Sequence, residues 1–229
     1  AVEEGRKIYQ NIRNFVRYQI STNVAAVGII FLTAFVLRWP LPLTATQILV
    51  INILMDGPPA VALGMEKNHG PVMDRPPRPV KEGLPSQFDT ALILFLGGIM
   101  MLGTVLIYYA VSFHDGHNLR EMARSGLDAP ARAMTATFTV FILFQLFNVM
   151  NCRSNTESVL GLGLFSNRAI NYSLVICIGL LFLCIEGAGI PLVGGLTIGS
   201  FLTTTTLGAP TLWVLLFSTA AVVLVVEEF

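Results

Sequence analysis

Charged residues are scarce in this 229-residue chain, where Asp, Glu, Lys and Arg together make up 12% of the residues. A typical soluble domain carries about 25%. Fourteen basic and fourteen acidic residues give a formal net charge of zero, which argues against nucleic-acid binding. The three cysteines are spaced neither like a disulfide framework nor like a thiolate metal site. Two of them, Cys177 and Cys184, lie in an apolar stretch and are interpreted as packing residues.

Apolar residues are abundant, at 54% of the chain, and the mean hydropathy is +0.69. They gather in stretches close to the roughly 20 residues that a membrane-spanning helix needs. The pattern predicts an all-α, polytopic membrane bundle, with residues 1–14 as a stalk of the first helix and residues 15–229 as a six-span transmembrane domain. The predicted spans are Phe15–Leu37, Leu43–Gly64, Thr90–Phe113, Ala133–Met150, Ile170–Leu192 and Ala209–Val226.

The basic residues are distributed unequally between the two sides of these spans. Ten of the fourteen Lys and Arg residues lie at the amino end, in the second-to-third loop or in the fourth-to-fifth loop, and four lie on the other side. Because cytoplasmic loops carry an excess of Lys and Arg, we expect both termini to be cytoplasmic. The loop Phe113–Arg132 is then expected on the opposite side of an integral, multi-pass membrane protein.

One acidic residue, Asp56, lies at mid-membrane in the second apolar stretch. A carboxylate at that depth costs at least about 2.5 kcal/mol unless its charge serves a purpose. The next residues are Gly57, Pro58 and Pro59. Because proline has no amide proton, we expect the helix to break at Gly57-Pro58-Pro59 and to leave carbonyl oxygens without amide partners. An anion beside such carbonyls predicts a binding site for a transported cation.

Neutral oxygen donors accompany this carboxylate. Asn52 precedes Asp56 by four residues, the spacing of one helix face. Asn23 is central in the first stretch, and Gln145 and Asn148 lie three apart in the fourth. Such donors suit a hard cation like Ca²⁺, whereas a soft metal would need His or thiolate ligands that are not clustered at that depth. Hydrogen bonding between helices, worth about 0.6–2 kcal/mol each, is the alternative reading for the amides.

Three motifs in order carry a resemblance to a known family. Residues Ala1–Ile12 resemble the stalk that leads into the fifth transmembrane helix of P-type cation ATPases. Ile51–Ala60 resembles the broken sixth helix of that family, and Met73–Arg78 resembles its cytoplasmic loop motif. The resemblance implies that the six predicted spans are helices five to ten of a ten-helix, ATP-driven pump that exports a cation from the cytoplasm.

Within this family the chain is most similar to calcium pumps of the secretory-pathway and plasma-membrane kinds. It has Ala26, Met55 and Gln145 where pumps of the two-calcium endoplasmic-reticulum kind have a glutamate, a threonine and a glutamate. The resemblance therefore implies one Ca²⁺ per cycle. Secretory-pathway relatives also carry Mn²⁺, and the run Gln47-Ile48-Leu49 matches that group, so Mn²⁺ remains an alternative ion. The implied metal ligands are Asp56, Asn52 and Asn23, with weaker contributions from Gln145 and the neighbourhood of Met55.

Several parts of a complete pump are not in this sequence. It contains no Asp-Lys-Thr-Gly-Thr phosphorylation motif, no Thr-Gly-Glu dephosphorylation motif and no nucleotide-binding domain. We therefore expect the chain by itself to hydrolyse no ATP, and no catalytic or cofactor-binding residue is assigned. ATP and Mg²⁺ would act only through amino-terminal pump domains, which are the expected partners together with the lipid bilayer. The chain is interpreted as a carboxy-terminal piece of a pump.

Two other classes of function remain open at this stage. A secondary cation transporter also uses broken helices, and inverted repeats would favour it, although the sequence shows none. A non-catalytic membrane module that scaffolds or regulates a pump is the second alternative. Pull-down of an ATPase partner, without ion flux from the chain itself, would favour that module.

Overall fold

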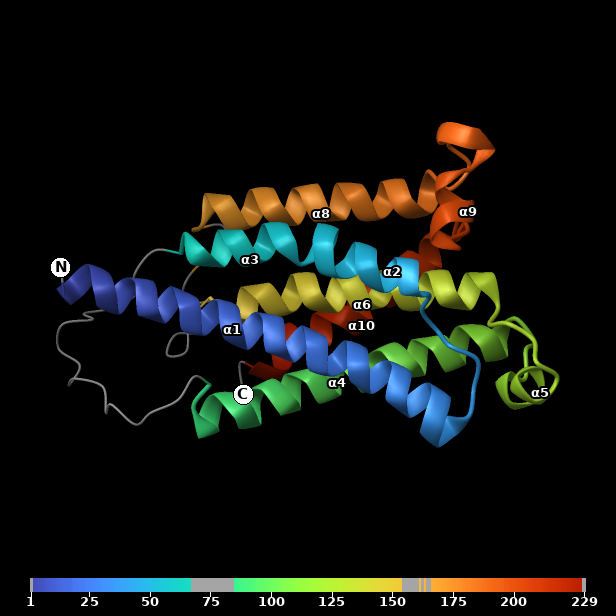
Figure 1. Cartoon of the computed structure of the whole chain (residues 1–229), viewed down its shortest axis with the longest axis horizontal. Coiled ribbons are helices and arrows are strands. Elements are labelled where there is room, and N and C mark those ends of the chain that lie inside the picture. Colours follow the sequence, from blue (N-terminus) through green and yellow to red (C-terminus); the bar gives the residue numbers. More distant parts are fainter. Residues whose placement is uncertain (1, 67–84, 154–160, 162, 164–165, 228–229) are drawn as a thin grey trace.

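The computed structural model describes residues 2–66, 85–153, 161, 163 and 166–227, and these form a bundle of helices that lie roughly side by side (Figure 1). The loop motif at Met73–Arg78 lies outside the described residues. In chain order the elements are α1 (Val2–Phe31), the π-helical turn η1 (Leu32–Leu37), α2 (Ala45–Val50), the π-helical turn η2 (Ile51–Met55), α3 (Gly57–Gly64), α4 (Gln87–His114), α5 (Leu119–Arg124), α6 (Ala131–Asn151), α8 (Arg168–Glu186), the 3₁₀ turn η3 (Val193–Gly195), α9 (Ile198–Leu202) and α10 (Pro210–Glu227).

The predicted membrane spans correspond to helices of the structure. Among the described residues, five helical stretches are long and apolar enough to cross a membrane, and a sixth, Pro210–Val225, is apolar but shorter. The prediction of a helical membrane bundle is thereby confirmed. The expected stalk and the first span form one continuous helix from Val2 to Leu37, so the proposed boundary at residue 14 has no structural break and stays a prediction. The five longer stretches are Val2–Leu37, Ala45–Gly64, Gln87–His114, Ala131–Asn151 and Arg168–Glu186.

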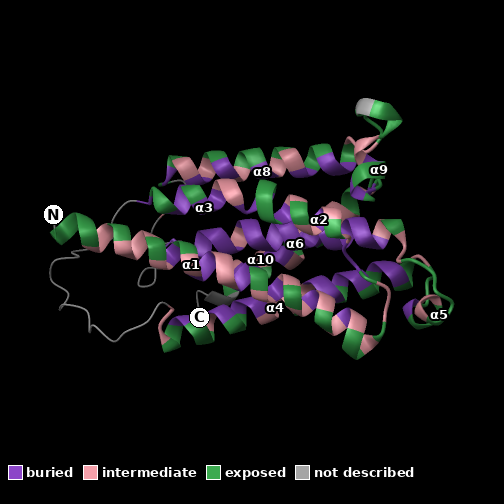
Figure 2. Cartoon of the chain, viewed as in Figure 1, coloured by how far each residue is buried: buried purple, intermediate pink, exposed green. Residues whose placement is uncertain are grey.

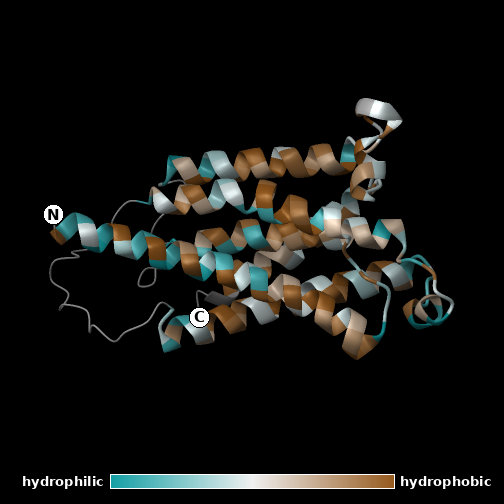
Figure 3. Ribbon diagram, viewed as in Figure 1, coloured by the Kyte–Doolittle hydropathy of each residue, from teal (hydrophilic) through white to brown (hydrophobic). Residues whose placement is uncertain are grey.

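Apolar residues prevail along most of the length of the helices (Figure 3). Large hydrophobic side chains are exposed on every long helix except α6, among them Val27, Phe35, Leu106, Val175 and Val214. Extended apolar surface of this kind is not stable against water and marks contact with a membrane or a partner. The exposed residues therefore agree with a multi-pass membrane protein.

Helix α6 is the central element of the bundle (Figure 2). In an apolar 18-residue stretch of α6, 94% of the residues are buried, whereas between 28 and 44% are buried in the corresponding stretches of the other four long spans. α4 and α10 pack extensively against it. The hydroxyl groups of Thr135, Thr137 and Thr139 each donate to the backbone carbonyl four residues earlier, so these polar groups are satisfied within their own helix. Such a helix can remain in an apolar interior.

The second span is interrupted, as its prolines predict. The irregular part consists of η2 and a bend at Asp56, directly before Gly57. Pro58 and Pro59 occupy the first positions of α3, where a missing amide proton costs no intrahelical hydrogen bond. Pro58 and Pro59 have no amide protons to bond the carbonyls four residues earlier. The helix is therefore distorted in the turn that precedes the predicted break at Gly57-Pro58-Pro59.

A buried ion pair joins the ends of α3 and α6. The Arg153 guanidinium donates to both carboxylate oxygens of Glu66, at 3.0 and 3.1 Å. Asn167, before α8, donates to the same carboxylate at 2.8 Å, and Asn14 of α1 donates to the Arg153 carbonyl at 2.8 Å. Arg153 is 1% and Glu66 2% exposed. In the sequence analysis, Arg153 is counted only as a basic residue of the fourth-to-fifth loop. In the structure its hydrogen bonds connect α1 with the ends of α3 and α6, and the Glu66 carboxylate that it binds is also held by Asn167 before α8.

Candidate cation site

Asp56 lies inside the bundle, between the π-helical turn η2 and α3. The residue is 1% exposed, so its carboxylate faces neither lipid nor open water. The hydroxyl of Tyr18, on α1, donates to Asp56 Oδ1 at 3.2 Å. Asp56 Oδ2 is buried and accepts no hydrogen bond of good geometry among the described residues; the Thr22 hydroxyl of α1, which donates to the Gln19 carbonyl at 3.0 Å, is the other donor near the carboxylate. One oxygen of the carboxylate is thus held by α1, and the other is available for a ligand.

Tyr18 belongs to a short series of hydrogen bonds that crosses from α3 to α6. Ser21 Oγ, one turn further along α1, donates to the Tyr18 carbonyl at 2.9 Å. Asn148 Nδ2, on α6, donates to Ser21 Oγ at 2.8 Å. Because Tyr18 and Ser21 lie on one face of α1, they place Asn148 at about the same depth as Asp56. The structure therefore assembles polar groups from three helices at one level of the bundle.

Unpaired oxygens are the chemical signature of this region. Asp56 Oδ2, Asn148 Oδ1 and Gln145 Oε1 are all buried without a hydrogen-bond partner among the described residues. Leaving a buried acceptor unpaired costs about 1–3 kcal/mol, and a bound cation removes that cost. No group of three or more His, Cys, Asp and Glu side chains occurs within the described part of the chain. A cation held here would depend on one carboxylate and neutral oxygens, a donor set suited to a hard ion.

The expected common face of Asn52 and Asp56 is not found. Asp56 is buried, but Asn52 is exposed. The cause is the π-helical turn, in which hydrogen bonds run from residue i to i+5; the Asp56 amide donates to the Ile51 carbonyl at 2.9 Å. Ile51, and not Asn52, therefore lies one turn before Asp56 and is buried with it. The role of Asn52 as a ligand stays a prediction.

Asn23 is also exposed, whereas its neighbours Ser21 and Thr22 are buried. The α1 face that meets α3 and α6 thus carries hydroxyl groups, and the Asn23 amide lies beside that face. This position leaves the ligand role of Asn23 untested.

Gln47 is buried at the start of α2, where its Oε1 accepts from the Thr44 amide at 2.9 Å as part of a capping box.

Cys177 has a contact that its interpretation as a packing residue did not include. Its thiol, on α8, donates to the Met55 carbonyl at 3.5 Å. In a regular α-helix this carbonyl would bond the amide of Pro59, which proline lacks. Cys177 thereby partners a carbonyl freed by the prolines, next to Asp56. In the sequence analysis, neither Cys177 nor Tyr18 is assigned to the cation site. The spacing of Tyr18, Ser21 and Thr22, which is that of one helix face, could have indicated a polar face of α1.

Replacing Tyr18 by Phe is expected to lower the free energy of unfolding of the Ca²⁺-free protein by about 1–3 kcal/mol, because a buried carboxylate loses its donor. Added Ca²⁺ should recover more stability in Tyr18→Phe than in the unchanged protein. Thermal unfolding in detergent, with and without Ca²⁺, measures both effects. Tyr172→Phe is the control, since Tyr172 is 67% exposed. Equal stability of Tyr18→Phe and the parent would show that the hydrogen bond contributes little.

Membrane-length helices around a buried carboxylate define a multi-pass helical membrane protein with a polar centre at an interrupted helix. The family model described as "Cation transporting ATPase, C-terminus" matches residues 40–229. The chain belongs to this family, and it corresponds to the carboxy-terminal membrane region of such ATPases.

Curated relatives that are similar to the chain are named as calcium-transporting ATPases. It is 41% identical over 175 residues to rat calcium-transporting ATPase type 2C member 2. It is 42% identical over 174 residues to calcium-transporting ATPase 1 of Saccharomyces cerevisiae and 42% identical over 175 residues to human calcium-transporting ATPase type 2C member 1. Each alignment covers 76% of this chain but only 17–18% of the relative. The resemblance to calcium pumps is confirmed, and the chain spans less than a fifth of their length.

Proposed function

We propose that this chain forms the ion-binding part of the membrane domain of an ATP-driven pump that exports Ca²⁺ from the cytoplasm. The observation that carries the proposal is the Asp56 carboxylate, which is buried at an interrupted helix with Oδ2 unpartnered among the described residues. The relatives named as calcium-transporting ATPases support Ca²⁺ as the transported ion.

The Asp56 carboxylate is the central ligand of the proposed site. Gln145 Oε1 is a candidate second oxygen, because it is buried without a partner among the described residues. Asn52 and Asn23 are exposed in this chain, yet an amide facing lipid at membrane depth is unfavourable. We therefore assign their exposed sides to contact with preceding helices of the pump, which would close the site from that direction.

The remaining pump functions are assigned to domains outside this chain. Phosphorylation, together with ATP and Mg²⁺ binding, needs motifs that the sequence does not contain, so the chain by itself is expected to hydrolyse no ATP. Residues 1–14 would connect the phosphorylation domain to the membrane part. The excess of basic residues on one side of the spans supports a cytoplasmic location of both termini.

Mn²⁺ is the alternative ion at the same site. Its octahedral oxygen chemistry overlaps with that of Ca²⁺, and the resemblance of Gln47-Ile48-Leu49 to pumps that carry both ions supports it. Gln47 lies nine residues before Asp56, at the start of α2. It would influence the choice of ion through the position of the helix, since its Oε1 already accepts from Thr44.

Uptake of radioactive Ca²⁺ into vesicles that contain the intact pump tests this function. We expect ATP-dependent uptake that saturates with Ca²⁺ and that Mn²⁺ inhibits if both ions share the site. Vesicles that contain only the 229-residue chain are the control and should show no ATP-dependent uptake. Absence of ATP-dependent uptake by the intact pump would contradict the proposal.

A further inference from the structure

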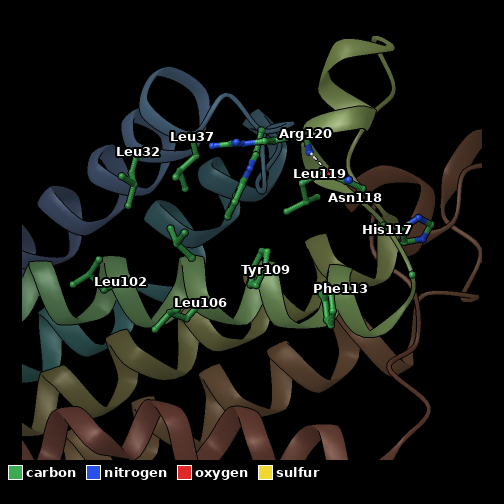
Figure 4. Close-up of a pocket in the computed structure, with 13 residues that line it drawn as sticks. Leu32, Leu37, Leu102, Leu106, Tyr109, Phe113, His117, Asn118, Leu119 and Arg120 are labelled. Atoms are coloured by element: carbon green, nitrogen blue, oxygen red, sulfur yellow. Dashed lines mark hydrogen bonds between the residues drawn. The ribbon is translucent and has the colours of Figure 1, made fainter.

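A cavity lies far along the bundle from Asp56, where η1, α4 and α5 meet (Figure 4). Its volume is about 740 Å³, within the roughly 300–1,000 Å³ of small-molecule sites. Leu32 and Leu37 form one wall, and Leu102 and Leu106 of α4 lie opposite them. This part of the lining is aliphatic over about one helical turn of α4.

The cavity is open to the lipid-facing surface of the bundle. Leu102 is 53% and Leu106 64% exposed, and Phe113, further along the same helix, is 70% exposed. A hydrocarbon chain can therefore enter sideways from the bilayer without passing through protein. An acyl chain matches this apolar lining, whereas a polar solute would lose its hydrogen bonds to water on entering.

The side of the cavity formed by α5 is polar and carries positive charge. Arg120, at the start of α5, extends its side chain toward Leu37, whereas Asn118 and His117 lie away from Leu37, with His117 the farther of the two (Figure 4). No acidic residue is among the described residues that line the cavity. Within the described part of the chain the Arg120 guanidinium makes no ion pair, whereas nearby Asp115 is paired with Arg132 at 2.9 Å. A guanidinium in this state is suited to a phosphate.

Aromatic side chains mark the level at which the apolar and polar parts meet. Trp39 and Tyr109 both line the cavity, and their rings stack with centroids 5.5 Å apart. Trp and Tyr concentrate where hydrocarbon gives way to headgroups. The cavity thus combines an apolar lining, aromatic rings and one guanidinium, the groups that an acyl chain, an interfacial region and a phosphate would contact.

We propose that this cavity binds one anionic phospholipid, with an acyl chain between η1 and α4 and its phosphate beside Arg120. The charge complementarity distinguishes this occupant from a neutral lipid, for which the guanidinium would gain little. The lipid would fill the space between η1 and α4, beyond the part of α1 that already packs against α4. The proposal is independent of which ion is transported at Asp56.

Quenching of Trp39 fluorescence by brominated lipids tests the proposal. The 229-residue chain contains two tryptophans, and Trp213→Phe leaves Trp39 as the single reporter. The chain is reconstituted in phosphatidylcholine vesicles with increasing fractions of phosphatidylglycerol brominated on one acyl chain, or of brominated phosphatidylcholine. We expect an association constant about five-fold higher for phosphatidylglycerol, the effect of one basic residue near an anionic group.

Matched variants identify the source of this preference. Arg120→Gln should bring the ratio close to one, whereas Arg124→Gln, on the same short helix but outside the cavity lining, should leave it unchanged. Circular dichroism confirms that each variant keeps its helices. Equal quenching by the two lipids, or a preference that survives Arg120→Gln, would overturn the proposal. Absence of quenching by either lipid would do so too, because it would show that protein covers the cavity.

Discussion

Substitution of Asp56 by Asn in the intact pump is expected to abolish Ca²⁺-dependent phosphorylation from ATP. The substitution keeps the shape of the side chain and an acceptor for the Tyr18 hydroxyl, but it removes the negative charge from the proposed site. At an effective dielectric constant of about 20, one pair of unit charges at 4 Å is worth roughly 4 kcal/mol, or about a thousand-fold in affinity. Incorporation of labelled phosphate at increasing free Ca²⁺ concentrations measures the loss.

Asp128→Asn is the matched control for this experiment. It makes the same chemical change at an exposed position between α5 and α6, and its Ca²⁺ dependence should equal that of the parent pump. Thermal unfolding of both variants separates a lost ligand from a lost fold. If Asp56→Asn retained the Ca²⁺ dependence of the parent, the assignment of the carboxylate as the ion ligand would be wrong.

Substitution of Arg153 by Ala is expected to cause the largest loss of stability, about 3–5 kcal/mol. The change removes the cation from a carboxylate that is 2% exposed. It also removes the guanidinium donor to the Gly163 carbonyl, at 3.0 Å. Removing one partner of a buried pair is costly because the remaining charge loses its counter-ion where water does not replace it. Unfolding by denaturing detergent, followed by circular dichroism, gives the free energy.

Two further variants distinguish the ion pair from general damage to this end of the bundle. Arg168→Ala removes a guanidinium that is exposed at the start of α8, and it should change stability by less than about 0.5 kcal/mol. The double variant Arg153→Met with Glu66→Leu should recover most of the lost stability, because an apolar pair has no charge to desolvate. A small effect of Arg153→Ala would show that Glu66 is compensated by other groups.

The second span shows how far sequence reasoning reached. Pro58 and Pro59 predicted an interrupted helix next to Asp56, and the structure has one, because a missing amide proton is a property of the residue itself. The same reasoning assumed a regular α-helix before the break and therefore placed Asn52 on the face of Asp56. The π-helical turn η2 adds one residue to that turn and rotates Asn52 outward. Periodicity in sequence carries no sign of such a turn.

The sequence and the tertiary structure determine different properties of this protein. The sequence by itself determined the helical membrane class, the succession of apolar spans, the buried acid and the position of the interruption, since each depends on the length or chemistry of a local segment. The tertiary structure decided which side chains meet. Tyr18 bonds Asp56 across 38 positions of the chain, and Ser21 meets Asn148 across 127. Arg153 reaches Glu66 across 87 positions. Such contacts depend on how each helix is rotated and packed against its neighbours, and no local pattern encodes that.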